Sequence, residues 1–133
     1  MSTTIDGPAE QLLKAKNFCN VATFRADGTI HGTPVWVDVQ DGRPTLNTAE
    51  GRAWPRNLER DPRVTLTVQD MQNPYRYVEI RGRVAERTHE GADEHIDALA
   101  KKYMDVDSYP LRKPGEQRVI IRVEPEHVYV NAP

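Results

Sequence analysis

The chain has 133 residues, of which 38% are hydrophobic and 29% are charged, and its formal net charge at pH 7 is -2. This length suits one domain with its own core, so we expect a single domain over residues 1–133. The chain lacks the basic excess that drives binding to nucleic acid, and no apolar run approaches the length of a membrane-spanning helix. We therefore expect neither nucleic acid nor a membrane as a partner.

Cysteine use indicates the compartment. Cys19 is the one cysteine of the sequence, so no internal disulfide can form, and the first residues lack the apolar core of a signal peptide. A reducing, cytoplasmic location is expected. Cys19 lies between Phe18 and Asn20 at the start of a predicted strand, where a small buried apolar side chain is a better interpretation than a nucleophile.

Hydrophobic periodicity predicts a β-rich chain with helical insertions. Apolar and polar residues alternate in several segments, for example at Val64, Leu66 and Val68. The predicted strands cover residues 20–25, 29–39, 44–48, 64–68, 77–84 and a C-terminal stretch made of 118–123 and 127–130. The predicted helices cover residues 10–15, a short basic segment that opens just after the strand 44–48, and residues 92–103.

Turn residues join these strands into hairpins. Ala26-Asp27-Gly28 and Asp41-Gly42 are strong hairpin turns, and Gly82, inside a strand, is typical of a bulge or a tight bend. About six strands joined by short turns favour a closed or partly closed antiparallel barrel over an open sheet. The predicted fold class is therefore mainly β with α insertions.

The segment from Thr33 to Val64 carries the clearest sign of a binding site. It is predicted to form a strand, a turn and a second strand, followed by a helix that opens at the second strand's carboxyl end. Free N–H groups and the dipole at a helix start attract anions, and Arg52, Arg56 and Arg60 lie close by. The same arginines could equally cover a solvated helix face, and the residues alone leave both interpretations open.

Neighbouring residues fit the anion-binding interpretation. Thr48 offers a hydroxyl at the strand end, Gly51 permits close approach to the backbone, and Pro55 suits a first helical turn. Arginine side chains bind phosphate through paired N–H donors. Trp36 and Trp54 could flank an aromatic ring, although packing in the core or at an interface explains each slightly better.

Several other chemistries lack their sequence motifs. Neither Ser2 nor Ser108 lies in a Gly-x-Ser-x-Gly context, and the sequence has no Walker A and no Gly-x-Gly-x-x-Gly motif. The four histidines are scattered without the spacing of metal ligands, so no metal site is expected. No catalytic residue can be named from these patterns.

The chain resembles the split β-barrel superfamily of pyridoxamine 5'-phosphate oxidase-like flavin and deazaflavin oxidoreductases. The resemblance extends from about residue 18 to residue 130 and rests on three segments in order: TPVWV, DGRPTLNTAEGRAWPRNLERDPRVTLTV and YRYVEIRGRVAE. Within this superfamily the chain looks most like the branch that uses the deazaflavin cofactor F420. The most specific segment, R-N-L-x-R-D-P-R-V at residues 56–64, marks the superfamily more firmly than the cofactor, because relatives that use FMN share related patterns.

The resemblance implies a six-stranded antiparallel split barrel (the FMN-binding split barrel) that forms a homodimer, with cofactor sites at the interface. Thr48, Arg52 and Arg56 would bind the cofactor phosphate. The other residues that it implies at the cofactor are Pro34, Val35, Trp36, Asn47, Trp54 and Asn57, with Tyr75 and Tyr77 reaching the site of the partner protomer. Trp54 departs from the pattern, because relatives often have a lysine there that helps to hold the phosphate.

The activity that the resemblance implies is that of an F420H2-dependent reductase. Such an enzyme transfers a hydride from the reduced deazaflavin to an electron-poor small molecule, such as an activated alkene, an imine or a quinone-like ring. Two alternatives stay open. One is an FMN-dependent oxidoreductase of the same fold, and the other is a non-catalytic module that binds a flavin or a tetrapyrrole.

Overall fold

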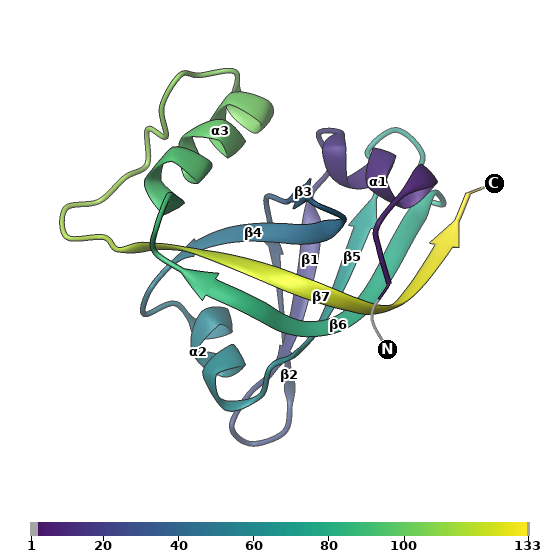
Figure 1. The fold of residues 1–133 in the computed structure, drawn as a ribbon, viewed down its shortest axis with the longest axis horizontal. Coiled ribbons are helices and arrows are strands. Elements are labelled where there is room, and N and C mark those ends of the chain that lie inside the picture. Colours follow the sequence, from purple (N-terminus) through teal and green to yellow (C-terminus); the bar gives the residue numbers. More distant parts are fainter. Residues whose placement is uncertain (1–2, 133) are drawn as a thin grey trace.

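The computed structural model describes residues 3–132, in which seven antiparallel strands form one sheet with three helices packed around it (Figure 1). The strands are β1 (Cys19–Phe24), β2 (Ile30–Val35), β3 (Asp38–Gln40), β4 (Arg43–Ala49), β5 (Arg63–Gln69), β6 (Tyr77–Thr88) and β7 (Arg118–Asn131). The helices are α1 (Gly7–Lys14), α2 (Ala53–Arg60) and α3 (Ala92–Met104). The predicted fold class, mainly β with α insertions, is confirmed.

The sheet closes on itself because its two edge strands follow each other in the sequence. The strand order is β2-β1-β5-β6-β7-β4-β3, so β2 and β3 are the edges. Six strand spacings of about 4.8 Å would place the edges of a flat sheet about 29 Å apart. Only Trp36 and Val37 separate the two strands, and three Cα–Cα steps of about 3.8 Å reach at most about 11 Å. The sheet must therefore curl into a barrel with its seam at these two residues.

The seam corrects the predicted strand count. Residues 29–39 were expected to form one strand, but they form β2, which pairs with β1, and β3, which pairs with β4. The sheet therefore has seven strands and not six. No glycine marks the break, and the apolar pattern continues through it, so periodicity alone could not show it. The C-terminal stretch also differs from its prediction, because β7 runs without a break through residues 124–126.

Helix α3 satisfies the backbone groups that lose their sheet partners at the seam. The backbone N–H of Val37 donates to the Tyr103 hydroxyl at 3.1 Å, and that hydroxyl donates to the carbonyl of Asn17 at 2.6 Å. The ammonium group of Lys102 donates to the carbonyls of Val37 and Leu13, both at 2.6 Å. Burial lowers the pKa of Lys102 to about 8 and raises the pKa of Tyr103 to about 12. These contacts tie α3 to the seam.

Replacing Tyr103 with phenylalanine should lower the free energy of unfolding by about 1–3 kcal/mol, because the change leaves the buried N–H of Val37 and the carbonyl of Asn17 without a partner. Urea unfolding measures the effect. Tyr109→Phe is the matched control, because no hydrogen bond of the Tyr109 hydroxyl is formed within residues 3–132. Equal stability of the two variants would contradict this account of the seam.

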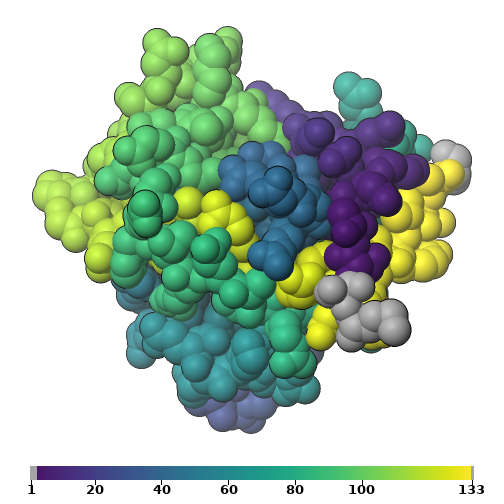
Figure 2. All heavy atoms as spheres, in the orientation of Figure 1, coloured from purple at the N-terminus to yellow at the C-terminus, as the bar shows by residue number. Residues whose placement is uncertain are grey.

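The barrel interior is filled by apolar side chains from every strand except β2, whose Val35 packs at its edge. The fully buried members include Cys19, Val21, Val37, Leu46, Leu66, Val68, Val78, Ile80, Val119, Ile121 and Val123. Gly82 lies at a register shift between β6 and β7, as predicted, and a side chain at this position would clash with the carbonyl oxygen of Glu124. In Figure 2 the purple segment that begins at residue 3 lies beside β7, which is yellow; the Thr3 N–H donates to the carbonyl of Pro125 at 2.8 Å.

Cys19 is fully buried, which confirms its expected place in the core, and burial raises the pKa of its thiol from 9.0 to about 12. The thiol therefore ionises in the unfolded chain before it does in the folded one. The free energy of unfolding should fall by a few kcal/mol as the pH rises from about 9 towards 12. Urea unfolding of Cys19→Ala should show a shallower decline over this range. The lowered pKa of Lys102 has the opposite effect, because it makes the free energy of unfolding rise between pH 8 and 10.5. Lys102 is present in both proteins, so its contribution cancels in the comparison.

Helix α3, the longest, has 13 residues. Within residues 3–132 no helix combines the length and the apolar character needed to cross a membrane.

Candidate functional site

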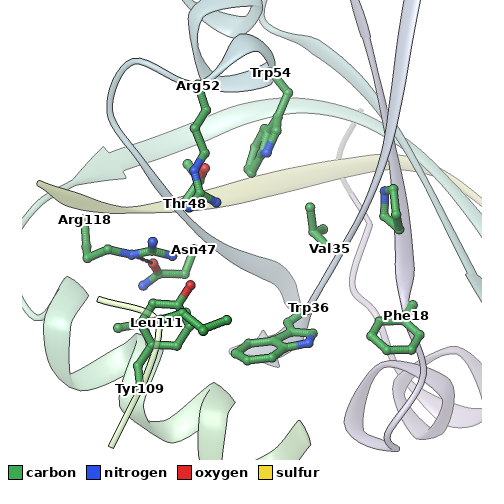
Figure 3. Close-up of a pocket in the computed structure, with 12 residues that line it drawn as sticks. Phe18, Val35, Trp36, Asn47, Thr48, Arg52, Trp54, Tyr109, Leu111 and Arg118 are labelled. Carbon is green, nitrogen blue, oxygen red and sulfur yellow. Dashed lines mark hydrogen bonds between the residues drawn. The ribbon is translucent and has the colours of Figure 1, made fainter. Parts of the chain in front are cut away.

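A pocket of about 440 Å³ opens at the barrel seam (Figure 3). Its walls come from the β2–β3 connection, the end of β4, the start of α2, α3 and the loop that leads into β7. The residues that line it are Phe18, Pro34, Val35, Trp36, Asn47, Thr48, Arg52, Trp54, Ile96, Tyr109, Leu111 and Arg118. The volume lies in the usual range for sites that bind small molecules and cofactors.

One end of the pocket has the character of an anion site. Arg52 is the N-cap residue of α2, and its side chain points towards Thr48 (Figure 3). The Thr48 hydroxyl is buried and has no hydrogen-bond partner within residues 3–132. Gly51, at a φ of +94°, makes the turn that brings Arg52 to the start of α2. In the first turn of α2 the N–H groups of Ala53 and Trp54 have no partners within the helix and add donors to this end, whereas Pro55 has no N–H.

Arg118 forms the wall beside the anion end. It is the first residue of β7, pairs with Ala49 of β4, and is only 4% exposed. Its Nε donates to Asn47 Oδ1 at 2.9 Å, and its Nη1 donates to Glu116 Oε1 at 3.1 Å. The guanidinium carbon lies 5.2 Å from the centroid of the Tyr109 ring. Charge-assisted hydrogen bonds and a cation–π contact therefore hold this buried cation in one orientation.

Asn47 joins three elements behind the pocket. Because its Oδ1 accepts from Arg118, its Nδ2 is free to donate to the carbonyl of Ala92 at 2.9 Å and to His95 Nδ1 at 3.1 Å. An accepting Nδ1 places the imidazole hydrogen on Nε2, and burial lowers the pKa of His95, so the ring is neutral. Both the oxygen and the nitrogen of the Asn47 amide are therefore hydrogen-bonded within the protein. Asn47 lines the pocket as part of its wall.

The opposite end of the pocket is aromatic and apolar. Trp36 stacks on Tyr103 with ring centroids 5.2 Å apart and an interplanar angle of 4°, and Tyr109 meets Trp36 edge-on at 6.0 Å. Leu111, which is 60% exposed, lines the same end. The loop that carries Tyr109 and Leu111 is fastened to α3, since Arg112 donates to Asp97 at 2.6 Å. This end suits a flat, apolar ring.

The structure brings together seven of the residues expected at the cofactor. The seven are Pro34, Val35, Trp36, Asn47, Thr48, Arg52 and Trp54. Four others lie outside the pocket. Arg56 is exposed one turn further along α2, while buried Asn57 donates to Thr23 Oγ1 at 3.1 Å. Tyr75, which is 75% exposed, and Tyr77 lie at the β5–β6 turn and the start of β6. The cofactor contacts of all eleven residues stay predictions.

Five lining residues were not predicted: Phe18, Ile96, Tyr109, Leu111 and Arg118. They come from parts of the chain that only barrel closure brings to the seam. One signal in the sequence could have indicated Arg118. An arginine that directly precedes an apolar run, here Val119 to Ile121, is costly to bury and therefore suggests a partner or a role at the strand end.

Comparison with known families gives a match to the family described as Pyridoxamine 5'-phosphate oxidase over residues 5–132. The chain belongs to this family. A search of curated proteins finds no match. A solved structure named F420 Reductase is 30% identical, with a TM-score of 0.79, and the match covers 90% of this chain and 94% of that one.

Two more distant structures share the fold of this family member. Conserved hypothetical protein Rv2991 from Mycobacterium tuberculosis is 23% identical, with a TM-score of 0.71, over 96% of this chain and 85% of that one. General Stress Protein 26 from Bacillus anthracis str. Sterne is 17% identical, with a TM-score of 0.70, over 92% and 90%. Family membership, together with the likeness to F420 Reductase, supports an oxidoreductase that works with a flavin or a deazaflavin.

Proposed function

We propose that this protein is an F420H2-dependent reductase whose pocket at the barrel seam binds the deazaflavin cofactor. One observation carries the proposal: the buried hydroxyl of Thr48 has no partner within residues 3–132, and the Arg52 side chain, which lines the same pocket, points towards Thr48 (Figure 3). A buried polar group without a partner is costly. A phosphate oxygen would satisfy it.

The residues present fit a cofactor that has a phosphate and a flat ring. Thr48, Arg52 and the first turn of α2 would hold the phosphate, and the surface around Pro34 and Trp36 would line the ring. Trp54 is 4% exposed and packs in the core, so it brings apolar surface to the site and no charge. The phosphate contact would therefore rest on Arg52 without the lysine that relatives often have.

The chemistry of the site agrees with a reaction in which the cofactor does the bond-making. Among the twelve described lining residues there is no carboxylate, imidazole, thiol or ammonium group that could act as a nucleophile or a general base. When bound, a reduced deazaflavin would supply the hydride to an electron-poor acceptor. The chain itself would fix the cofactor and hold the acceptor against the open ring face. Water would supply the proton.

We also propose the homodimer that the family resemblance implies. Exposed aromatic side chains lie near the β5–β6 turn and the end of β7: Tyr75 is 75% exposed, Tyr129 is 56% exposed, and the Tyr77 and Tyr129 rings lie 6.2 Å apart. Burying this surface against a second copy would be favourable. Sedimentation equilibrium should give twice the mass of one chain, and a monomer at micromolar concentration would contradict the proposal. A cytoplasmic location stays the prediction made from the single cysteine.

Two titrations and one kinetic assay test the proposed function. F420 and FMN are titrated separately into the protein, and fluorescence changes report binding. The oxidation of F420H2 is then followed with a panel of activated alkenes, imines and quinones. The proposal expects F420 to bind and at least one acceptor to be reduced. Tight binding of FMN with no binding of F420 would support the FMN-dependent alternative, and binding without turnover would support a non-catalytic module.

A further inference from the structure

A buried carboxylate stands directly behind the anion end of the pocket. The Glu116 side chain is 6% exposed, and each of its oxygens faces a different arginine. Oε1 lies 3.1 Å from Arg118 Nη1, and Oε2 lies 3.8 Å from Arg52 Nη2. A turn fixes the position of Glu116, because its N–H donates to the carbonyl of Lys113 at 3.1 Å and Gly115 adopts a φ of +75°.

Glu116 halves the positive charge that the pocket presents. Two arginines and one glutamate leave one net positive charge at this end of the pocket, where the arginines alone would give two. Other charges nearby do not alter this sum: Glu50 is already paired with Arg87 and His89, and Arg56 lies outside the pocket. Glu116 does not line the pocket itself, so its influence passes through Arg52 and Arg118.

Anions of different charge respond differently to such a site. The phosphodiester of F420 carries one negative charge, whereas the phosphomonoester of FMN carries about 1.5 to 2 at pH 7. The cost of removing an anion from water rises with the square of its charge, while its attraction to the site rises only in proportion to the charge. A site with one net positive charge therefore offsets the dehydration of a phosphodiester better than that of a phosphomonoester.

We propose that Glu116 is a positioning residue that sets the cofactor preference: it lowers the charge around Arg52 and Arg118 so that the site selects a phosphodiester over a phosphomonoester. The inference rests on the proposed cofactor site. It accounts for a carboxylate buried between the two arginines of a site whose ligand is expected to be anionic.

The test measures the dissociation constants of F420, FMN and uncharged riboflavin for the wild type and for Glu116→Gln. Glutamine keeps an acceptor for Arg118 and removes the charge. The added positive charge favours FMN over F420, so the ratio of their dissociation constants, FMN to F420, should fall about three- to tenfold. Riboflavin binding should stay unchanged. Glu94→Gln, an equal charge change on the exposed face of α3, is the control and should leave the ratio unaltered.

A double variant separates charge from shape. In E116Q/R118Q the anion end again carries one net positive charge, so the wild-type ratio should return. Glu116→Ala repeats the charge change where E116Q does not fold. A wild type that binds F420, with an unchanged FMN to F420 ratio in the Glu116 variants, would overturn the inference alone. A wild type that binds neither cofactor would overturn the proposed function as well.

Discussion

Replacing Arg52 with alanine is expected to weaken F420 binding about ten- to a hundredfold, which is the value of losing charge-assisted hydrogen bonds to a phosphate. The loss of affinity should affect only ligands that have a phosphate. Riboflavin, which lacks it, should bind the variant as it binds the wild type. Because the Arg52 side chain is 48% exposed and makes only a 3.8 Å ion pair, the variant should unfold at nearly the wild-type temperature. Fluorescence titration and thermal unfolding check both expectations.

Two further arginines of α2 serve as comparisons for Arg52. Arg60 donates to Asn57 Oδ1 at 2.9 Å, away from the pocket, so Arg60→Ala should leave F420 binding intact. Arg56→Ala tests the sequence-based prediction that this exposed residue shares the phosphate. If Arg52→Ala bound F420 as tightly as the wild type does, the proposal that Arg52 binds the cofactor phosphate would be wrong.

Arg118→Met should lower the free energy of unfolding by about 3 kcal/mol. The change leaves the buried carboxylate of Glu116 without its 3.1 Å partner and leaves Asn47 Oδ1 without its donor. Removing one member of a buried ion pair costs far more than the pair contributes, because the remaining charge stays desolvated. Urea unfolding gives the size of the effect.

The matched control is Arg122→Met on the same strand. Arg122 pairs with Glu86, whose side chain is 51% exposed, and donates to Gln40 at 3.0 Å. An ion pair in contact with water contributes little, so this change should cost less than about 1 kcal/mol. Equal losses in the two variants would mean that the buried network beside the pocket adds nothing beyond an ordinary surface pair.

Local patterns in the sequence were enough to place Thr48 and Arg52 together, but they also grouped Arg56 and Arg60 with Arg52, and these two arginines do not line the pocket. The end of β4, Gly51 and the start of α2 are adjacent in the chain, so Thr48 and Arg52 could be placed together from turn and helix-start signals alone. The same holds for the hairpins β1–β2 and β3–β4, because each is built from neighbouring segments joined by a short turn. Helix α3 follows its predicted bounds within one residue, since its apolar stripe is long and regular.

The parts that sequence could not predict depend on barrel closure. The seam at Trp36 and Val37 divides the strand predicted for residues 29–39 into β2 and β3. Neither residue type at the seam indicates a break in a strand. Arg118 joins Asn47 because β4 and β7 pair in one register, a contact across 71 positions of sequence. Tyr109 belongs to the loop between α3 and β7, and no sequence pattern places this loop at the pocket. These contacts depend on pairing between segments that are distant in the sequence. Local periodicity does not indicate which segments pair.

A crystal structure with bound F420 would show whether the pocket at the barrel seam is the cofactor site. The cofactor phosphate should lie within hydrogen-bond distance of Thr48 Oγ1 and the Arg52 guanidinium, with the ring against Pro34 and Trp36 at the barrel seam. A phosphate placed away from Arg52, or a ring bound outside this pocket, would contradict this prediction.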